Sequence, residues 1–185
     1  TFVLGPDAWR AADAIAKSGR PVVLDADLVH RERDPITLKE VETAVPPIFA
    51  KKNVKFALQS SGSSLSQRYL NAQAATAVRL GVDRDTALKA ITLWPAEILG
   101  LGDRLGAIAK GRDANLLILS GDPLATTTFV DTVILDGFVQ YERSKDERLK
   151  HLLEVAAKPG SKDSKPAESR EADKKDSEKK ETEKK

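Results

Sequence analysis

The sequence contains no cysteine and no methionine, and only two of its 185 residues are histidines. The lack of cysteine excludes disulfides, thiolate metal ligands and a thiol nucleophile. Apolar runs such as 115–119 are far shorter than the roughly 20 residues that cross a bilayer, and no signal-like segment begins the chain. We therefore expect a soluble chain without a membrane partner, whether cytoplasmic or exported. Because it starts at Thr1 and holds no methionine, we also expect a fragment or a processed form.

The sequence also lacks a large excess of one charge, because it contains 30 basic and 28 acidic residues and has a formal net charge of +2. The two signs are interspersed and form no basic face, which argues against nucleic-acid binding. The hydrophobic content of 41% is sufficient for a core. The composition thus predicts one folded body whose partners are not nucleic acids.

The C-terminal segment 159–185 has no aromatic or branched apolar side chain, so it cannot contribute to a core. We expect a disordered, charged tail, and a role as a basic-tail adaptor would depend on this segment alone. Before it, Leu149, Leu152, Leu153 and Ala156 recur at helical spacing and predict a terminal helix within 144–158. We expect its apolar stripe to pack on the domain.

The first 60 residues alternate between strand and helix patterns. Short apolar runs predict strands at 1–4, 21–24 and 54–58, and Gly5-Pro6 begins a helix that ends at Ser18-Gly19. A second helix is predicted by five apolar residues, with a break at Pro46-Pro47; these are Leu38, Val41, Val45, Ile48 and Phe49. Strands separated by helices indicate a parallel sheet, in either a TIM barrel or a doubly wound fold.

The pattern changes in the second half of the chain. Helices are predicted at 66–80, 83–93 and 94–100, with Asp83 as an N-cap. Strands are predicted at 106–108, 116–119 and 132–135, and Asp136-Gly137 is a preferred pair for a two-residue hairpin turn. The second half therefore predicts a small β unit after the helices.

Several of these segments resemble the amidohydrolase superfamily, most closely the imidazolonepropionase-like amidohydrolases. The resemblance covers about residues 54–142 and rests on GVDRDTALKAIT at 81–92, PAEILGL at 95–101, LGAIAKGRDANL at 105–116, GDPL at 121–124 and VILDG at 133–137. It implies the C-terminal part of an α/β protein: a partial TIM barrel with the last three strands and their helices at 1–104, then a small β-sandwich portion at 105–143. The terminal helix at 144–158 and the disordered tail at 159–185 would follow.

The resemblance also implies a chemistry. Hydrolases of this family cleave carbon–nitrogen bonds other than peptide bonds in small, amide-type substrates, with one or two divalent, zinc-type metal ions. Histidines from early strands and from the fifth and sixth strands hold the metal, together with an aspartate at the end of the eighth. The metal lowers the pKa of its bound water, and the aspartate can accept the water's proton.

This chain departs from that pattern at the aspartate. Ser61, or alternatively Ser60, occupies its place, and a serine hydroxyl is a weak ligand and a poor base. We expect Ser60, Ser61 and Gly62 to form a rim of the substrate pocket. His30, on the loop side after the second strand, is a candidate metal ligand, whereas His151 is expected to be solvated.

Because the strands that carry the early histidines are absent, we expect this chain to bind no metal alone and to need the missing N-terminal half of the barrel as a partner. Unpaired strand edges would make the isolated chain prone to aggregate. Two functions stay open: a fragment of a metal-dependent hydrolase, or a catalytically inactive relative that serves as a binding or scaffold protein.

Overall fold

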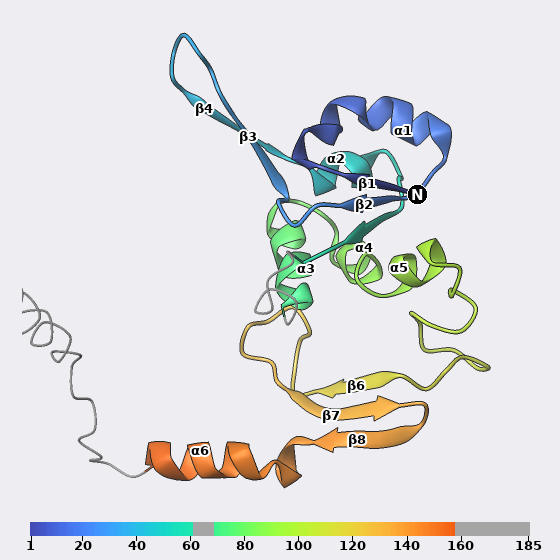
Figure 1. Cartoon of the computed structure of the whole chain (residues 1–185), viewed down its shortest axis with the longest axis vertical. Coiled ribbons are helices and arrows are strands. Elements are labelled where there is room, and N and C mark those ends of the chain that lie inside the picture. Colours follow the sequence, from blue (N-terminus) through green and yellow to red (C-terminus); the bar gives the residue numbers. More distant parts are fainter. Residues whose placement is uncertain (61–68, 158–185) are drawn as a thin grey trace, which may run out of the picture. The chain divides into compact units, whose positions relative to one another are not determined.

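The computed structural model describes residues 1–60 and 69–157 (Figure 1). The chain divides into two compact units, Thr1–Lys145 and Asp146–Lys185. The tail predicted for 159–185 lies outside the described residues. No helix in the described part is both long enough and apolar enough to cross a membrane.

A parallel sheet of three strands forms the centre of the first unit. Strands β1 (Phe2–Leu4), β2 (Val22–Leu24) and β5 (Phe56–Leu58) are arranged in the order β1-β2-β5, and both pairs are parallel. The connection from β1 to β2 contains the 3-10 helix η1 (Pro6–Ala11) and helix α1 (Ala12–Ser18). The predicted parallel sheet with a helical connection is confirmed.

The helix predicted across 38–45 is wrong. In its place, strands β3 (Val29–Arg33) and β4 (Glu40–Ala44) pair as an antiparallel hairpin that projects from the sheet in Figure 1. Val41 and Thr43 are β-branched and alternate with glutamates, which suits a strand. The helix starts only at α2 (Pro46–Lys51), where proline is tolerated in the first turn.

The turn of this hairpin is fixed by Asp34. Its Oδ1 accepts hydrogen bonds from the backbone N–H groups of Thr37, at 2.7 Å, and Ile36, at 2.8 Å. These bonds favour the charged carboxylate, so they hold the pKa of Asp34 below its usual value. The side chain of Asp34, which precedes a proline, thus stabilises a reversal of the chain. A turn held in this way competes with helix formation in the segment.

Three α-helices follow β5 in the described residues of the first unit: α3 (Leu70–Arg79), α4 (Arg84–Lys89) and α5 (Leu93–Ile98). Asp83 caps α4 as predicted, because its carboxylate accepts the backbone N–H of Thr86 at 3.1 Å. That bond lowers the pKa of Asp83. The helices contribute small side chains to the interior, which lets their backbones approach the sheet; Ala74, Ala77, Ala87 and Ala90 are all fully buried.

The core joins the sheet to these helices. Phe49 of α2 and Phe56 of β5 have no exposed surface, and Val22 and Leu24 of the central strand are at most 1% exposed. The rings of Phe56 and Trp94 meet edge to face with centroids 5.5 Å apart. This arrangement is favoured by the ring quadrupoles, so the pair fixes α5 against the sheet.

A second, antiparallel sheet contains β6 (Leu116–Leu119), β7 (Val130–Leu135) and β8 (Phe138–Glu142) in that order, and η3 (Arg143–Lys145) follows it. The predicted hairpin turn is confirmed, since Asp136 and Gly137 both have positive φ angles, of 51° and 84°. Large apolar side chains of this sheet are exposed, among them Phe138, Val139 and Leu117.

The strand predicted at 106–108 is wrong, because these residues form an irregular connection. Gly106 has a φ of 87° and lies so close to α5 that a Cβ atom there would be 2.7 Å from the carbonyl oxygen of Thr92. This close approach to a helix, and not pairing with a strand, explains the glycine.

The second unit contains helix α6 (Glu147–Ala157), so the predicted terminal helix is confirmed. Asp146 precedes it, and its Oδ1 accepts the backbone N–H groups of Arg148 and Leu149 at 3.0 and 3.1 Å. His151 is exposed, as expected. Packing of the apolar stripe of this helix on the domain stays a prediction.

Candidate functional site

Polar side chains gather where the parallel strands end. The register aligns Leu4, Leu24 and Leu58, the last residues of β1, β2 and β5, so the residues after them share one edge of the sheet. Asp25 follows the central strand and Gln59 follows β5. Ligands of parallel sheets bind at this edge, outside the carboxyl ends of the strands. It is therefore our candidate site.

Asp25 is held at this edge by both its backbone and its side chain. Its N–H donates to the carbonyl oxygen of Leu4 at 3.0 Å, which continues the β1–β2 pairing by one residue. Its Oδ1 accepts the N–H of Ala26 at 2.6 Å and the side-chain amide of Gln59 at 3.3 Å. The half-buried carboxylate is thus positioned by two neighbouring strands.

Helix α3 holds the loop after β2 from another direction. The side-chain amide of Gln73 donates to the carbonyl oxygen of Ala26 at 3.1 Å. Leu28, two residues further, is 4% exposed and belongs to the core. The loop that carries Asp25 is therefore attached both to α3 and to the interior, and a rigid frame of this kind keeps a binding group in place.

The serines predicted for the pocket rim are only partly described. Ser60 is half-buried and directly follows Gln59 at the same edge. Ser61, which takes the place of the expected aspartate, and Gly62 lie outside the described residues. The structure thus brings Ser60 to the edge where Asp25 lies, and the binding roles of all three residues stay predictions.

His30 lies on strand β3, and not on a loop as predicted. Its ring centroid is 6.3 Å from that of Trp9 in η1, and its Nε2 is 3.9 Å from Oε2 of Glu32. Both His30 Nε2 and Trp9 Nε1 are buried without a hydrogen-bond partner among the described residues. The hairpin carries His30 onto η1 instead of toward other ligands, so its metal-binding role stays a prediction.

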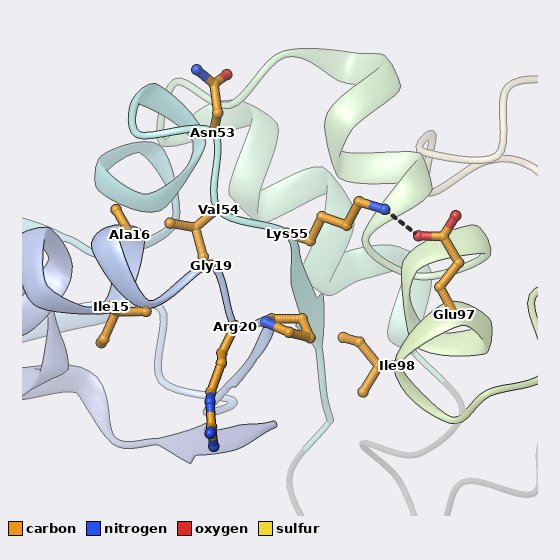
Figure 2. Close-up of a pocket in the computed structure, with 10 residues that line it drawn as sticks. Ile15, Ala16, Gly19, Arg20, Asn53, Val54, Lys55, Glu97 and Ile98 are labelled. Carbon is orange, nitrogen blue, oxygen red and sulfur yellow. Dashed lines mark hydrogen bonds and ion pairs between the residues drawn. The ribbon is translucent and has the colours of Figure 1, made fainter.

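The opposite edge of the sheet contains an open pocket of about 400 Å³ (Figure 2). It lies between α1, the segments that precede β2 and β5, and α5, with apolar walls that include Ile15 and Ile98. Figure 2 shows the Lys55 side chain reaching Glu97, and their Nζ and Oε2 atoms are 2.8 Å apart. Because this edge holds the amino ends of parallel strands, we interpret the pocket as structural.

Sequence reasoning overlooked Asp25, Gln59 and Gln73 as site residues. The signal for the first two was present, because each directly follows a short apolar run that forms a parallel strand. Gln73 had no such signal, since its hydrogen bond to Ala26 depends on how α3 packs.

Comparison with known proteins gives one consistent result. Residues 66–141 match the amidohydrolase family. The chain is 32% identical over 83 residues to amidohydrolase tasK of Hapsidospora irregularis, which is 45% of this chain and 8% of that protein. It is 39% identical over 69 residues to an N-substituted formamide deformylase of Arthrobacter pascens, which is 34% of this chain and 13% of that protein.

A solved structure resembles a larger part of the chain. The crystal structure of an amidohydrolase from Thermotoga maritima has a TM-score of 0.63 and 32% sequence identity, over 76% of this chain and 37% of that one. The chain thus spans a minor part of each of these three proteins.

Proposed function

Because this chain belongs to the amidohydrolase superfamily, we propose that it forms part of a hydrolase that cleaves carbon–nitrogen bonds other than peptide bonds. The observation that carries the proposal is the candidate site: a carboxylate, an amide and a serine hydroxyl, from Asp25, Gln59 and Ser60, at the carboxyl edge of a parallel sheet. The substrate would be a small amide-type molecule, and the name of the relative that is an N-substituted formamide deformylase supports this class.

In this proposal β1, β2 and β5 are the last three strands of a TIM barrel within 1–104, and β6–β8 are the sandwich portion within 105–143. Among the described residues, β1 and β5 each pair only with β2, so both leave an edge where further barrel strands can pair. The exposed apolar side chains of β6–β8 likewise support a further layer in the natural protein. The missing N-terminal half of the barrel is the partner that would supply these elements.

The superfamily implies a divalent metal of the zinc type, but the described residues do not fit one. Within 1–60 and 69–157, no group of three or more His, Cys, Asp or Glu side chains could hold an ion. A catalytic zinc needs about three protein ligands. We therefore assign no ligand and no metal-dependent step to the described residues; their role is to bind and orient the substrate.

One observation favours a second function. Ser61 replaces the aspartate that the family resemblance implies. This supports a catalytically inactive relative that serves as a binding or scaffold protein. Metal analysis separates the readings: an inactive relative would gain bound zinc only in the Ser61→Asp variant, whereas an active hydrolase would retain it with serine in place.

Turnover tests the proposed function. The purified natural protein is incubated with N-substituted formamides and, as a control, with dipeptides, and the free amine released is quantified. The proposal predicts amine release from the formamides and none from the dipeptides. Failure to release amine from any non-peptide amide, in a preparation that is folded and contains its metal, would contradict it.

A further inference from the structure

Asp25 is the carboxylate that the parallel sheet itself positions at the candidate site. It follows the central strand, and its backbone N–H still takes part in the sheet through Leu4. A side chain on such a rigid element has little freedom to leave the edge. The position of the Asp25 carboxylate relative to a ligand bound at this edge is therefore fixed.

Only one of the two carboxylate oxygens is used within the described residues. Oδ1 accepts the N–H of Ala26 and the amide of Gln59, at 2.6 and 3.3 Å. An ionised carboxylate can accept about four hydrogen bonds. Oδ2 has no hydrogen-bond partner in the ranges 1–60 and 69–157, and no lysine, arginine or histidine there forms an ion pair with Asp25.

Asp34 of the hairpin turn shares this combination within the described residues, but Asp25 differs from it in lying at the carboxyl edge of the parallel sheet. Half-buried carboxylates in proteins are commonly paired with a cation, because partial loss of water weakens their solvation. Two other half-buried aspartates of this chain follow that pattern, Asp113 with Arg104 and Asp131 with Arg143. Asp25 is instead oriented by neutral amides, which leaves its negative charge available for a donor that the ligand brings.

We propose that Asp25 binds the nitrogen side of the ligand, with Oδ2 accepting a hydrogen bond from an amide N–H or an ammonium group. The inference rests on the proposed function, since hydrolysis of a carbon–nitrogen bond gives an amine, which is protonated at neutral pH. An ammonium carries both charge and donors, so it binds this carboxylate more strongly than a neutral group of the same shape. Gln59 is the positioning residue that holds Oδ1.

Binding of a matched pair of probes tests the proposal. Calorimetric titration of the natural protein compares benzylamine, a cation at neutral pH, with benzyl alcohol, its neutral counterpart of similar shape. We expect benzylamine to bind at least about tenfold more tightly, as one charge-assisted hydrogen bond provides. Asp25→Asn should remove this preference, and Gln59→Met should reduce it.

Asp27→Asn is the matched control, because Asp27 is exposed on the same loop and carries the same charge. It should retain the preference for benzylamine. Equal binding of the two probes by the unaltered protein, or equal losses in Asp25→Asn and Asp27→Asn, would overturn the proposal. If Asp25→Asn does not fold, the NMR signals of the Gln59 side-chain amide in the unaltered protein test the proposal instead. These signals must shift when benzylamine is added and must not shift when benzyl alcohol is added.

The binding test and the turnover test can fail separately. A protein that binds benzylamine through Asp25 but hydrolyses no amide refutes the proposed function and leaves this inference intact. A hydrolase whose amine binding does not depend on Asp25 refutes only the inference.

Discussion

Gly106 and Gly111 form a matched pair on which the described packing can be tested. Both have a φ of 87°, a conformation that L side chains rarely adopt. They differ in their surroundings. A Cβ atom at Gly106 would lie 2.7 Å from the carbonyl oxygen of Thr92 and 2.8 Å from the Cα of Leu93, whereas at Gly111 it would meet nothing within 4 Å.

The expected losses of unfolding free energy follow from the φ angle and from these contacts. Alanine in a left-handed conformation costs about 1–2 kcal/mol, and this cost applies to both variants. At Gly106 the two nearest contacts are with backbone atoms of Thr92 and Leu93 at the start of α5, which cannot move aside as a flexible side chain can. Overpacking of this kind costs about 1–3 kcal/mol more. Gly111→Ala should thus lose about 1–2 kcal/mol of unfolding free energy and Gly106→Ala about 2–5 kcal/mol.

Urea denaturation of the two variants, followed by far-UV circular dichroism, measures this difference. Thermal melting provides a second estimate, with about 2–4 °C expected per kcal/mol for a protein of this size. Because the φ penalty cancels between the variants, the comparison isolates the contact with α5. Equal losses in the two variants would show that Gly106 does not approach α5 as described and would refute the reasoning.

Three further outcomes are expected. Phe56→Ala should destabilise the protein by about 3–5 kcal/mol in urea melts, because it empties a fully buried site beside Trp94, whereas a loss below about 1 kcal/mol would contradict the described core. The pKa of Asp83 is lowered in the folded protein, so its cap stabilises the fold above the unfolded-state pKa, and this stability is lost as the pH falls through the lower native value. Between pH 5 and pH 2 the natural protein should therefore lose more unfolding free energy than Asp83→Asn, as thermal melts measure. Equal losses in the two proteins would argue against the cap. Lys55→Gln should change the unfolding free energy by less than about 1 kcal/mol, because the ion pair with Glu97 is largely exposed. It should also leave benzylamine binding unchanged. Weaker benzylamine binding by this variant would assign a function to the pocket at the amino edge.

The parallel sheet and most helices could be predicted because their signals are local. Short apolar runs gave β1, β2 and β5, and Asp136-Gly137 gave the turn between β7 and β8. Asp83 could be assigned as a cap because an N-cap depends only on residues within one turn. These elements have little competition from tertiary contacts.

The errors lie where a local pattern fits two structures. Leu38, Val41 and Val45 are spaced as in a helix, but the turn at Asp34 and the pairing of β3 with β4 stabilise a hairpin. Gly106 is compatible with a bend beside a strand, and only its approach to α5 shows that it belongs to an irregular connection.

The candidate site was predictable in place but not in composition. The rule that sites lie at the carboxyl ends of parallel strands located the edge, and Ser60 lies there. The hydrogen bonds that join Asp25 to Gln59, and Ala26 to Gln73, connect residues 34 and 47 positions apart. Hydrogen bonds between residues so far apart in the sequence leave no local pattern from which they could be predicted.

A crystal structure of the natural protein with benzylamine bound tests the central claim most directly, because it shows which edge of the sheet binds the ligand. The account predicts the ammonium group at hydrogen-bond distance from Oδ2 of Asp25, beside Gln59 and Ser60. Benzylamine bound instead in the pocket lined by Arg20, Lys55 and Glu97, with the carboxyl edge unchanged, would contradict it.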